Sequence, residues 1–179
     1  MLTIKTSVRA LVLLLVSALL WSAPGSVASA QSVKDQQLIS EITESVKAAI
    51  AATTGTRFEV NAVGNDFANS ILTDKATMAK IVARAKAACT KLNVVAKKGP
   101  KAVKAQALKI GTDLGKDQRT QLISLESDPD LTFDDKFSIG VVIGMVNASM
   151  FTNGMNVYCP RHAKQASVLV QAINAAIIG

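Results

Sequence analysis

Apolar residues recur at steps of three and four along most of the chain after residue 31, which is the pattern of amphipathic helices. The pattern is clearest over residues 73–96, where one stripe contains Met78, Ile81, Val82, Ala85, Cys89 and Leu92. Further helices are expected at residues 33–52, 100–110 and 161–178, with a short helical piece at 65–72 and a turn or two of helix at 117–125. The sequence therefore predicts an all-α fold, a single-domain bundle of five or six helices.

The most apolar run beyond the N-terminus covers residues 133–160 and predicts a buried central helix. Thr132 and Asp135 are spaced as in a capping box, with Asp in place of the usual Glu. The part from Ile139 to Val146 is rich in β-branched residues, so a strand is the rival interpretation there. The apolar pattern continues to Tyr158, and this length favours a helix.

Glycines predict two features of the helices, a packing groove and an interruption. Gly140, Gly144 and Ala148 are spaced four residues apart, and small residues at this spacing predict a groove in which a neighbouring helix packs closely. Gly111 and Gly115 are expected instead to interrupt the helix that begins after the Gly99-Pro100 break.

Residues 1–30 have the features of a secretory signal peptide. A basic start precedes the apolar run from Ala10 to Trp21, and Ala28-Ser29-Ala30 matches the small-residue cleavage pattern. An uncleaved membrane anchor is the alternative, but a run of about a dozen residues is shorter than the roughly 20 that a spanning helix needs. We therefore expect one domain over residues 31–179, without a stable membrane span, exported to the periplasm, the cell envelope or the medium.

The chain has two cysteines, Cys89 and Cys159, and an exported chain meets an oxidising compartment. An even pair is then most simply one disulfide, with a single possible connectivity. Closing a loop of about 70 residues would stabilise the fold by roughly 4 kcal/mol in the chain-entropy model.

Candidate catalytic and metal sites are few. His162 follows Cys159 by three residues, which suggests a Cys/His nucleophile pair, but a disulfide would remove the thiolate that this pair requires. A zinc site needs three or four ligands, and the two cysteines and the histidine supply three at most. Calcium is a further alternative at Glu126, Asp128, Asp130, Asp134 and Asp135, although the EF-hand glycine and final glutamate are missing. We predict a non-enzymatic protein without a cofactor or metal.

The chain is basic, with 20 Lys and Arg against 13 Asp and Glu and a formal net charge of +7. The densest basic region consists of Lys91, Lys97, Lys98, Lys101, Lys104 and Lys109. It predicts either an ordinary solvated surface or a patch for an anionic partner such as lipid, a wall polymer or an acidic protein. Without the leader, the aromatic residues are five Phe and one Tyr, too few to favour a stacking platform for nucleic acid.

Three short motifs between residues 67 and 160 resemble those of a known family. They are Phe67 to Leu72 ahead of a helix that ends in Ala88-Cys89-Thr90-Lys91-Leu92, the Gly99-Pro100 break, and Val157-Tyr158-Cys159-Pro160. With these motifs, roughly residues 66–163 resemble a domain of unknown function in small secreted proteins of mycobacteria and their relatives. The resemblance implies a helical fold with paired cysteines and carries no assigned activity. The chain departs from the pattern in its helix over residues 38–52 and in its longer segment between the cysteines.

These observations predict an exported, non-enzymatic helical binding protein of the bacterial envelope or medium. Its partner would be an unknown protein or an anionic envelope component, not nucleic acid. The same pattern of helices and cysteines is similar to periplasmic immunity proteins that neutralise peptidoglycan-cleaving toxins, so an immunity or inhibitor protein is one alternative. Another is a carrier of an apolar ligand, lined by Met145, Met150, Met155 and Phe151, although core packing explains these residues equally.

Overall fold

The structure is a computed structural model that describes residues 32–178, and its regular elements are all helices. They are α2 (Val33–Ala51), α3 (Ala62–Thr73), α4 (Lys75–Val95), the 3-10 helix η1 (Ala96–Lys98), α5 (Pro100–Glu126), α6 (Phe133–Tyr158), the 3-10 helix η2 (Pro160–His162) and α7 (Gln165–Ile178). The all-α prediction and the predicted disulfide between Cys89 and Cys159 are confirmed. The predicted signal peptide lies outside the described residues.

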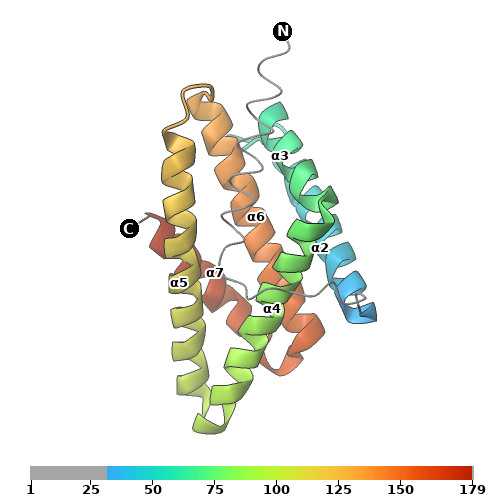
Figure 1. Cartoon of the computed structure of the whole chain (residues 1–179), viewed down its shortest axis with the longest axis vertical. Coiled ribbons are helices and arrows are strands. Elements are labelled where there is room, and N and C mark those ends of the chain that lie inside the picture. Colours follow the sequence, from blue (N-terminus) through green and yellow to red (C-terminus); the bar gives the residue numbers. More distant parts are fainter. Residues whose placement is uncertain (1–31, 179) are drawn as a thin grey trace.

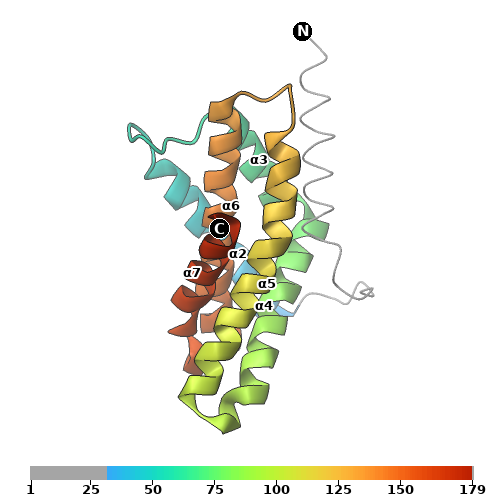
Figure 2. The ribbon, with the colours of Figure 1, turned by 90° about the vertical axis from the view of Figure 1, so that its left-hand side faces the viewer.

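The bundle is arranged around α6, which contacts each of the other five α-helices. Helix α5 packs mainly against α7, and α4 and α5 form a hairpin whose turn projects beyond the other helices (Figures 1 and 2). The turn between α5 and α6 lies at the opposite end of the bundle (Figure 1). The two ends of the molecule are therefore formed by different turns of the chain.

Helix α6 is continuous, which excludes a strand over residues 139–146. The predicted capping box is present, because the side chain of Thr132 accepts from the N–H of Asp135 and the Asp135 carboxylate accepts from the N–H of Thr132. Within the part of the chain that the structure describes, α6 is the one helix long and apolar enough to cross a membrane, but 56% of its most apolar window is buried in the fold. This burial is the pattern of a core helix.

The interruption expected at Gly111 and Gly115 is wrong, because α5 continues as one helix from Pro100 to Glu126. A Cβ atom added to Gly111 would lie 2.5 Å from the carbonyl oxygen of Leu169, and one added to Gly115 would lie 2.5 Å from that of Ile173. The two glycines thus allow α5 to contact the backbone of α7. A glycine inside a helix costs only about 1 kcal/mol relative to Ala, and this close packing offsets that cost.

The sequence predicts a packing groove at Gly140, Gly144 and Ala148, but the described helices do not use it. A Cβ atom added to Gly140 or Gly144 would meet no atom of residues 32–178 within 4 Å. The close contact of α6 occurs further along, where a Cβ atom on Gly154 would lie 2.7 Å from the Cβ of Ala85 in α4. The spacing of small residues identifies a narrow helix face, but it does not tell whether a neighbour covers it.

Two helices begin at different residues from those expected. Helix α3 begins at Ala62 rather than at residue 65, and its N-cap is Asn61, whose side chain accepts a hydrogen bond of 3.0 Å from the N–H of Gly64. The last helix begins at Gln165, since the chain after Cys159 first forms the 3-10 turn η2. In both cases an α-helix is present as predicted, and only its first residue differs from the expected one.

Candidate functional site

The basic region predicted from the sequence lies on and beside the turn between α4 and α5. We call it the basic hairpin and define it as Lys91, Lys97, Lys98, Lys101, Lys104 and Lys109. All six lysines are exposed. The turn between the two helices projects from the bundle (Figures 1 and 2).

The basic hairpin has few acidic neighbours. The sequence from Lys75 to Thr112 contains no Asp or Glu. Within residues 32–178, Lys109 is the one member with a salt bridge, in which its Nζ lies 2.8 Å from Oδ2 of the exposed Asp113. Positive charge is therefore concentrated at this end of the molecule.

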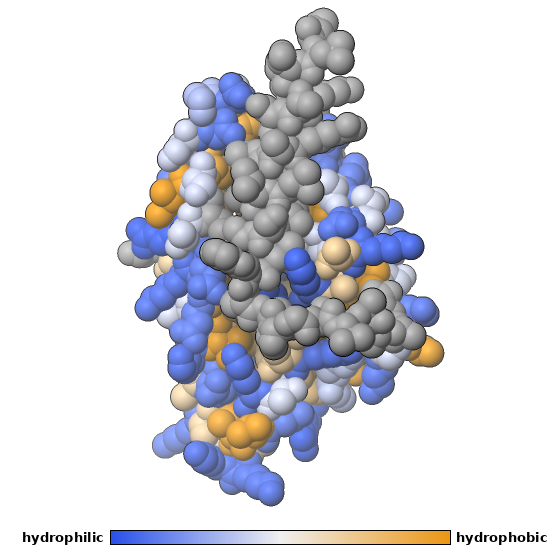
Figure 3. Space-filling model, viewed as in Figure 1, coloured by the Kyte–Doolittle hydropathy of each residue, from blue (hydrophilic) through white to orange (hydrophobic). Residues whose placement is uncertain are grey.

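Apolar side chains accompany these lysines. Val94, in the last turn of α4, is 71% exposed, and Leu108 of α5 is 45% exposed. Figure 3 shows a hydrophobic patch surrounded by hydrophilic residues at the lower end of the molecule, where the hairpin projects in Figure 1. An apolar centre with a cationic rim is typical of surfaces that bind anionic membranes.

A pocket opens between α3, α4 and α6. The pocket is small, with an accessible volume of about 20 Å³, and its walls are largely apolar. The apolar lining consists of Ile71, Ile81, Ile143, Val146 and Met150. Met150 is the one member of the predicted apolar-ligand lining that reaches this pocket; Phe151 and Met155 are buried in the core, and Met145 packs at its edge.

Polar groups occupy part of the pocket wall. Asn147 exchanges two hydrogen bonds of 2.9 Å with Gln118 of α5, so each of these two buried amides is paired with the other. Arg84 differs, because its guanidinium forms no hydrogen bond or salt bridge within residues 32–178. Burial lowers the pKa of Arg84, and the more distant Asp117 carboxylate counteracts part of this effect. Arg84 is thus a half-buried cation without a counter-ion in direct contact.

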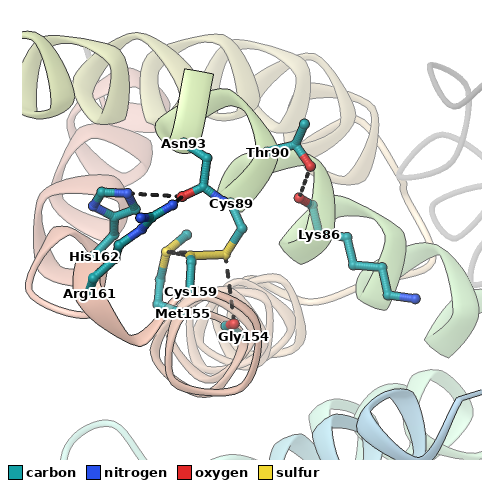
Figure 4. Close-up of a disulfide and its surroundings, with 9 residues drawn as sticks. All are labelled: Lys86, Cys89, Thr90, Asn93, Gly154, Met155, Cys159, Arg161 and His162. Carbon is teal, nitrogen blue, oxygen red and sulfur yellow. Dashed lines mark hydrogen bonds between the residues drawn. A yellow bond between two sulfur atoms is a disulfide. The ribbon is translucent and has the colours of Figure 1, made fainter. Parts of the chain in front are cut away.

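Cys159 and His162, the possible Cys/His pair, make contacts that hold the fold together. Cys159 is bonded to Cys89, so no thiolate is available (Figure 4). His162 is buried, with its Nε2 atom 3.1 Å from Oδ1 of Asn93, and the same oxygen accepts a hydrogen bond of 2.9 Å from Arg161. Burial, and then the positive charge of Arg161, lowers the pKa of His162. These contacts fasten η2 to α4 beside the disulfide.

The acidic residues between 126 and 135 do not assemble into a metal site. Nowhere in the described part of the chain do three His, Cys, Asp or Glu side chains gather closely enough to hold an ion. The backbone N–H of Asp130 donates to Asp128 at 2.8 Å, and Asp135 both caps α6 and accepts a hydrogen bond of 2.8 Å from Asn61. These carboxylates shape the turn and the start of α6.

A partly buried ionic cluster, which the sequence reasoning missed, joins three helices. Asp35 of α2 accepts hydrogen bonds from Lys86 of α4 at 2.8 Å and from the hydroxyl of Tyr158 of α6 at 2.6 Å. Burial alone would raise the pKa of Asp35, but hydrogen bonds from Lys86, Tyr158 and Ser32 outweigh it and lower the pKa to about 2. Burial and the Asp35 carboxylate raise the pKa of Tyr158. The only local signal is the spacing of Ser32 and Asp35, which form a capping box for α2.

Three phenylalanines stack on the surface at the end opposite the basic hairpin. The ring centroids of Phe58 and Phe137 are 6.2 Å apart, and those of Phe133 and Phe137 are 6.5 Å apart. Phe133 is 80% exposed, Phe58 45% and Phe137 40%. This apolar surface carries no pattern of charge that identifies a partner.

Comparisons with protein-family models, with curated proteins and with solved structures find no match to this chain. The resemblance to the two-cysteine secreted domain of mycobacteria therefore stays a prediction.

Proposed function

We propose that the protein is an exported, non-enzymatic binding protein that attaches to anionic lipid of the cell envelope through the basic hairpin. The observation that carries this proposal is the group of six exposed lysines on the basic hairpin, which also exposes Val94. Of these lysines, only Lys109 has a salt bridge within the described residues. The disulfide is consistent with an oxidising, exported environment.

The energetics of such a surface favour a membrane. A lysine close to an anionic bilayer contributes about 1 kcal/mol, and the attraction decays over a Debye length of roughly 8 Å at physiological salt. The projecting turn lets several lysines reach the headgroups together, so their contributions add. The apolar side chain of Val94 would insert among the lipid headgroups and gain apolar contact there. A purely polar polyanion offers no such contact. Lipid is therefore the partner that fits both features of the hairpin.

Sedimentation with vesicles tests this proposal. We expect the protein to bind vesicles that contain phosphatidylglycerol, to leave vesicles of phosphatidylcholine alone unbound, and to dissociate as salt is added. The variant Lys97→Gln/Lys98→Gln/Lys101→Gln removes three charges from the hairpin and should weaken binding about tenfold or more. Its matched control, Lys34→Gln/Lys47→Gln/Lys75→Gln, removes three exposed charges elsewhere and should retain most of the affinity.

The outcomes separate lipid attachment from a general effect of net charge and from binding to a soluble polymer. Equal losses in the two triple variants would show that net charge alone governs binding, and the hairpin would lose its assigned role. Equal binding to both kinds of vesicle would overturn the electrostatic basis. Binding to soluble polyphosphate without binding to phosphatidylglycerol vesicles would overturn the choice of lipid and indicate an anionic polymer.

A further inference from the structure

One side of α6 is an apolar surface that the described helices leave open. We call it the α6 face, and it consists of residues spaced three and four apart: Phe133, Phe137, Gly140, Val141, Gly144 and Ala148. The two phenylalanines are exposed and the other four residues are half-buried. From Phe137 to Tyr158 the helix contains no charged residue. A contiguous exposed apolar surface commonly marks a site of protein–protein or membrane contact.

The glycines of the α6 face differ from the other glycines in the long helices. At Gly111, Gly115 and Gly154, an added Cβ atom would lie 2.5 to 2.7 Å from an atom of another helix. At Gly140 and Gly144 it would meet no atom of residues 32–178 within 4 Å. Glycine lowers the stability of a helix, and close packing offsets this cost at the first three positions. A partner chain on the α6 face would offset it at the other two.

The order of large and small side chains on the α6 face complements the same order read backwards. From Phe133 to Ala148 the face reads large, large, small, large, small, small. A second copy that lies antiparallel, with a two-fold axis crossing α6 between Gly140 and Val141, therefore places every large side chain opposite a small one. The facing pairs are Phe133 with Ala148, Phe137 with Gly144, and Val141 with Gly140. A two-fold axis makes each contact twice, as in an isologous interface.

The charges around the α6 face favour the same arrangement. Asp134 and Asp135 at the start of α6 would be repelled by an anionic membrane, so lipid fits this face less well than a second copy does. In an antiparallel pair the basic hairpins project from opposite ends of the dimer, because the hairpin and the start of α6 lie at opposite ends of each copy (Figure 1). A parallel pair would bring the two hairpins together, and like charges repel.

We propose that two copies of the protein associate through the α6 face as an antiparallel dimer with two-fold symmetry, in which the Phe137 ring of each copy packs over Gly144 of the other. The contact extends along about four turns of one helix from each copy. It is smaller than the roughly 1,600 Å² of a standard interface, so we expect a weak dimer with a dissociation constant on the order of 10 μM.

Analytical ultracentrifugation over a range of protein concentrations tests the association. We expect monomer at low concentration and dimer at high concentration, without larger species, because a two-fold contact is closed. Phe137→Ala removes the packing ring and Gly144→Leu fills the space that receives it, so each should raise the dissociation constant about tenfold or more. The double variant Phe137→Ala/Gly144→Leu exchanges large and small on both sides of the axis. It should return the dissociation constant towards that of the unchanged protein.

Matched controls change apolar surface elsewhere. Leu108→Ala removes an exposed apolar side chain from α5, and Ala83→Leu adds one to α4, so both should dimerise as the unchanged protein does. Circular dichroism and the melting temperature, recorded at concentrations where the protein is monomeric, show whether each variant is folded. If Phe137→Ala or Gly144→Leu is not, then Phe133→Ala and Ala148→Leu, singly and combined, make the same exchange at the outer pair.

Three results would overturn the proposal. A protein that stays monomeric well above the expected dissociation constant does not form the dimer. Unchanged dimerisation of Phe137→Ala and Gly144→Leu would show that the contact lies elsewhere. A double variant that dimerises no better than its single variants would contradict the antiparallel pairing. The samples contain no lipid, so the outcome does not depend on membrane attachment by the basic hairpin.

Discussion

Asp35 shows how one side chain can hold three helices in register. Asp35 is 8% exposed, and its carboxylate accepts hydrogen bonds from the ammonium of Lys86 in α4 and the hydroxyl of Tyr158 in α6. Truncating one partner of a buried charge pair leaves the other without its counter-ion, which is costly. Since the Lys86 side chain is 44% exposed and keeps part of its hydration, the cost at this site is moderate.

The first prediction concerns the substitution Asp35→Asn. It should lower the free energy of unfolding by about 1–3 kcal/mol near neutral pH, because charge-assisted hydrogen bonds contribute about that much. The folded-state pKa of Asp35 is about 2, below the usual value of 3.8, so its contribution is complete above pH 3.8 and disappears as the pH falls towards 2. Urea unfolding of both proteins at several pH values should show their difference shrinking over this interval.

Glu44→Gln is the control for this prediction, because Glu44 is exposed on the same helix. It should change stability by less than about 0.5 kcal/mol. The pKa values of Asp74 and Asp135 are also lowered, so both proteins lose stability in acid and only their difference reports Asp35. A difference that stays constant from neutral pH to pH 2 would contradict the assignment.

At the scale of elements, the existence of most helices and the cap of α6 were predictable because they depend on neighbouring residues. The apolar steps placed α4, and the Thr132/Asp135 box placed the start of α6. The continuity of α5 depends on contacts with α7, more than 50 residues later in the sequence, so its glycines suggested a break where there is a packing surface. The Asp35 cluster was missed for the same reason, because Lys86 and Tyr158 lie 51 and 123 residues away.

The second prediction compares glycines in two helices. Gly111→Ala should destabilise the protein by about 1–3 kcal/mol, since the new Cβ would meet the backbone of Leu169 and overpacking costs that much. Gly140→Ala adds a Cβ that no atom of residues 32–178 approaches within 4 Å, so it should stabilise by about 0.5–1 kcal/mol through helix propensity. Melting temperatures of the two variants should therefore move in opposite directions. An increase for Gly111→Ala would contradict the close packing of α5 against α7.

At the scale of the whole molecule, two features organise the protein: a charged end and a covalent link in the core. The basic hairpin was visible in the sequence as the densest basic region of the chain. The pocket was not, because its lining comes from three helices and only Met150 was among the residues expected to line an apolar site. The disulfide joins the C-terminal half of α4 to the residue after α6, with a Cα–Cα distance of 5.8 Å. It thereby encloses α5 and the basic hairpin in one covalent loop.

The third prediction is that this loop supplies a large share of the stability. Cys89 and Cys159 are 70 residues apart, and closing a loop of this length contributes about 4 kcal/mol in the chain-entropy model. The double variant Cys89→Ala/Cys159→Ala should lose somewhat more, because both sulfurs are buried and Sδ of Met155 lies 3.2 Å from Sγ of Cys159. Urea unfolding of the oxidised, the reduced and the double-variant protein measures both parts. Reduction alone should account for most of the loss in the free energy of unfolding. A loss below about 1 kcal/mol on reduction would contradict this prediction and show that packing around α6 holds the bundle without the covalent link.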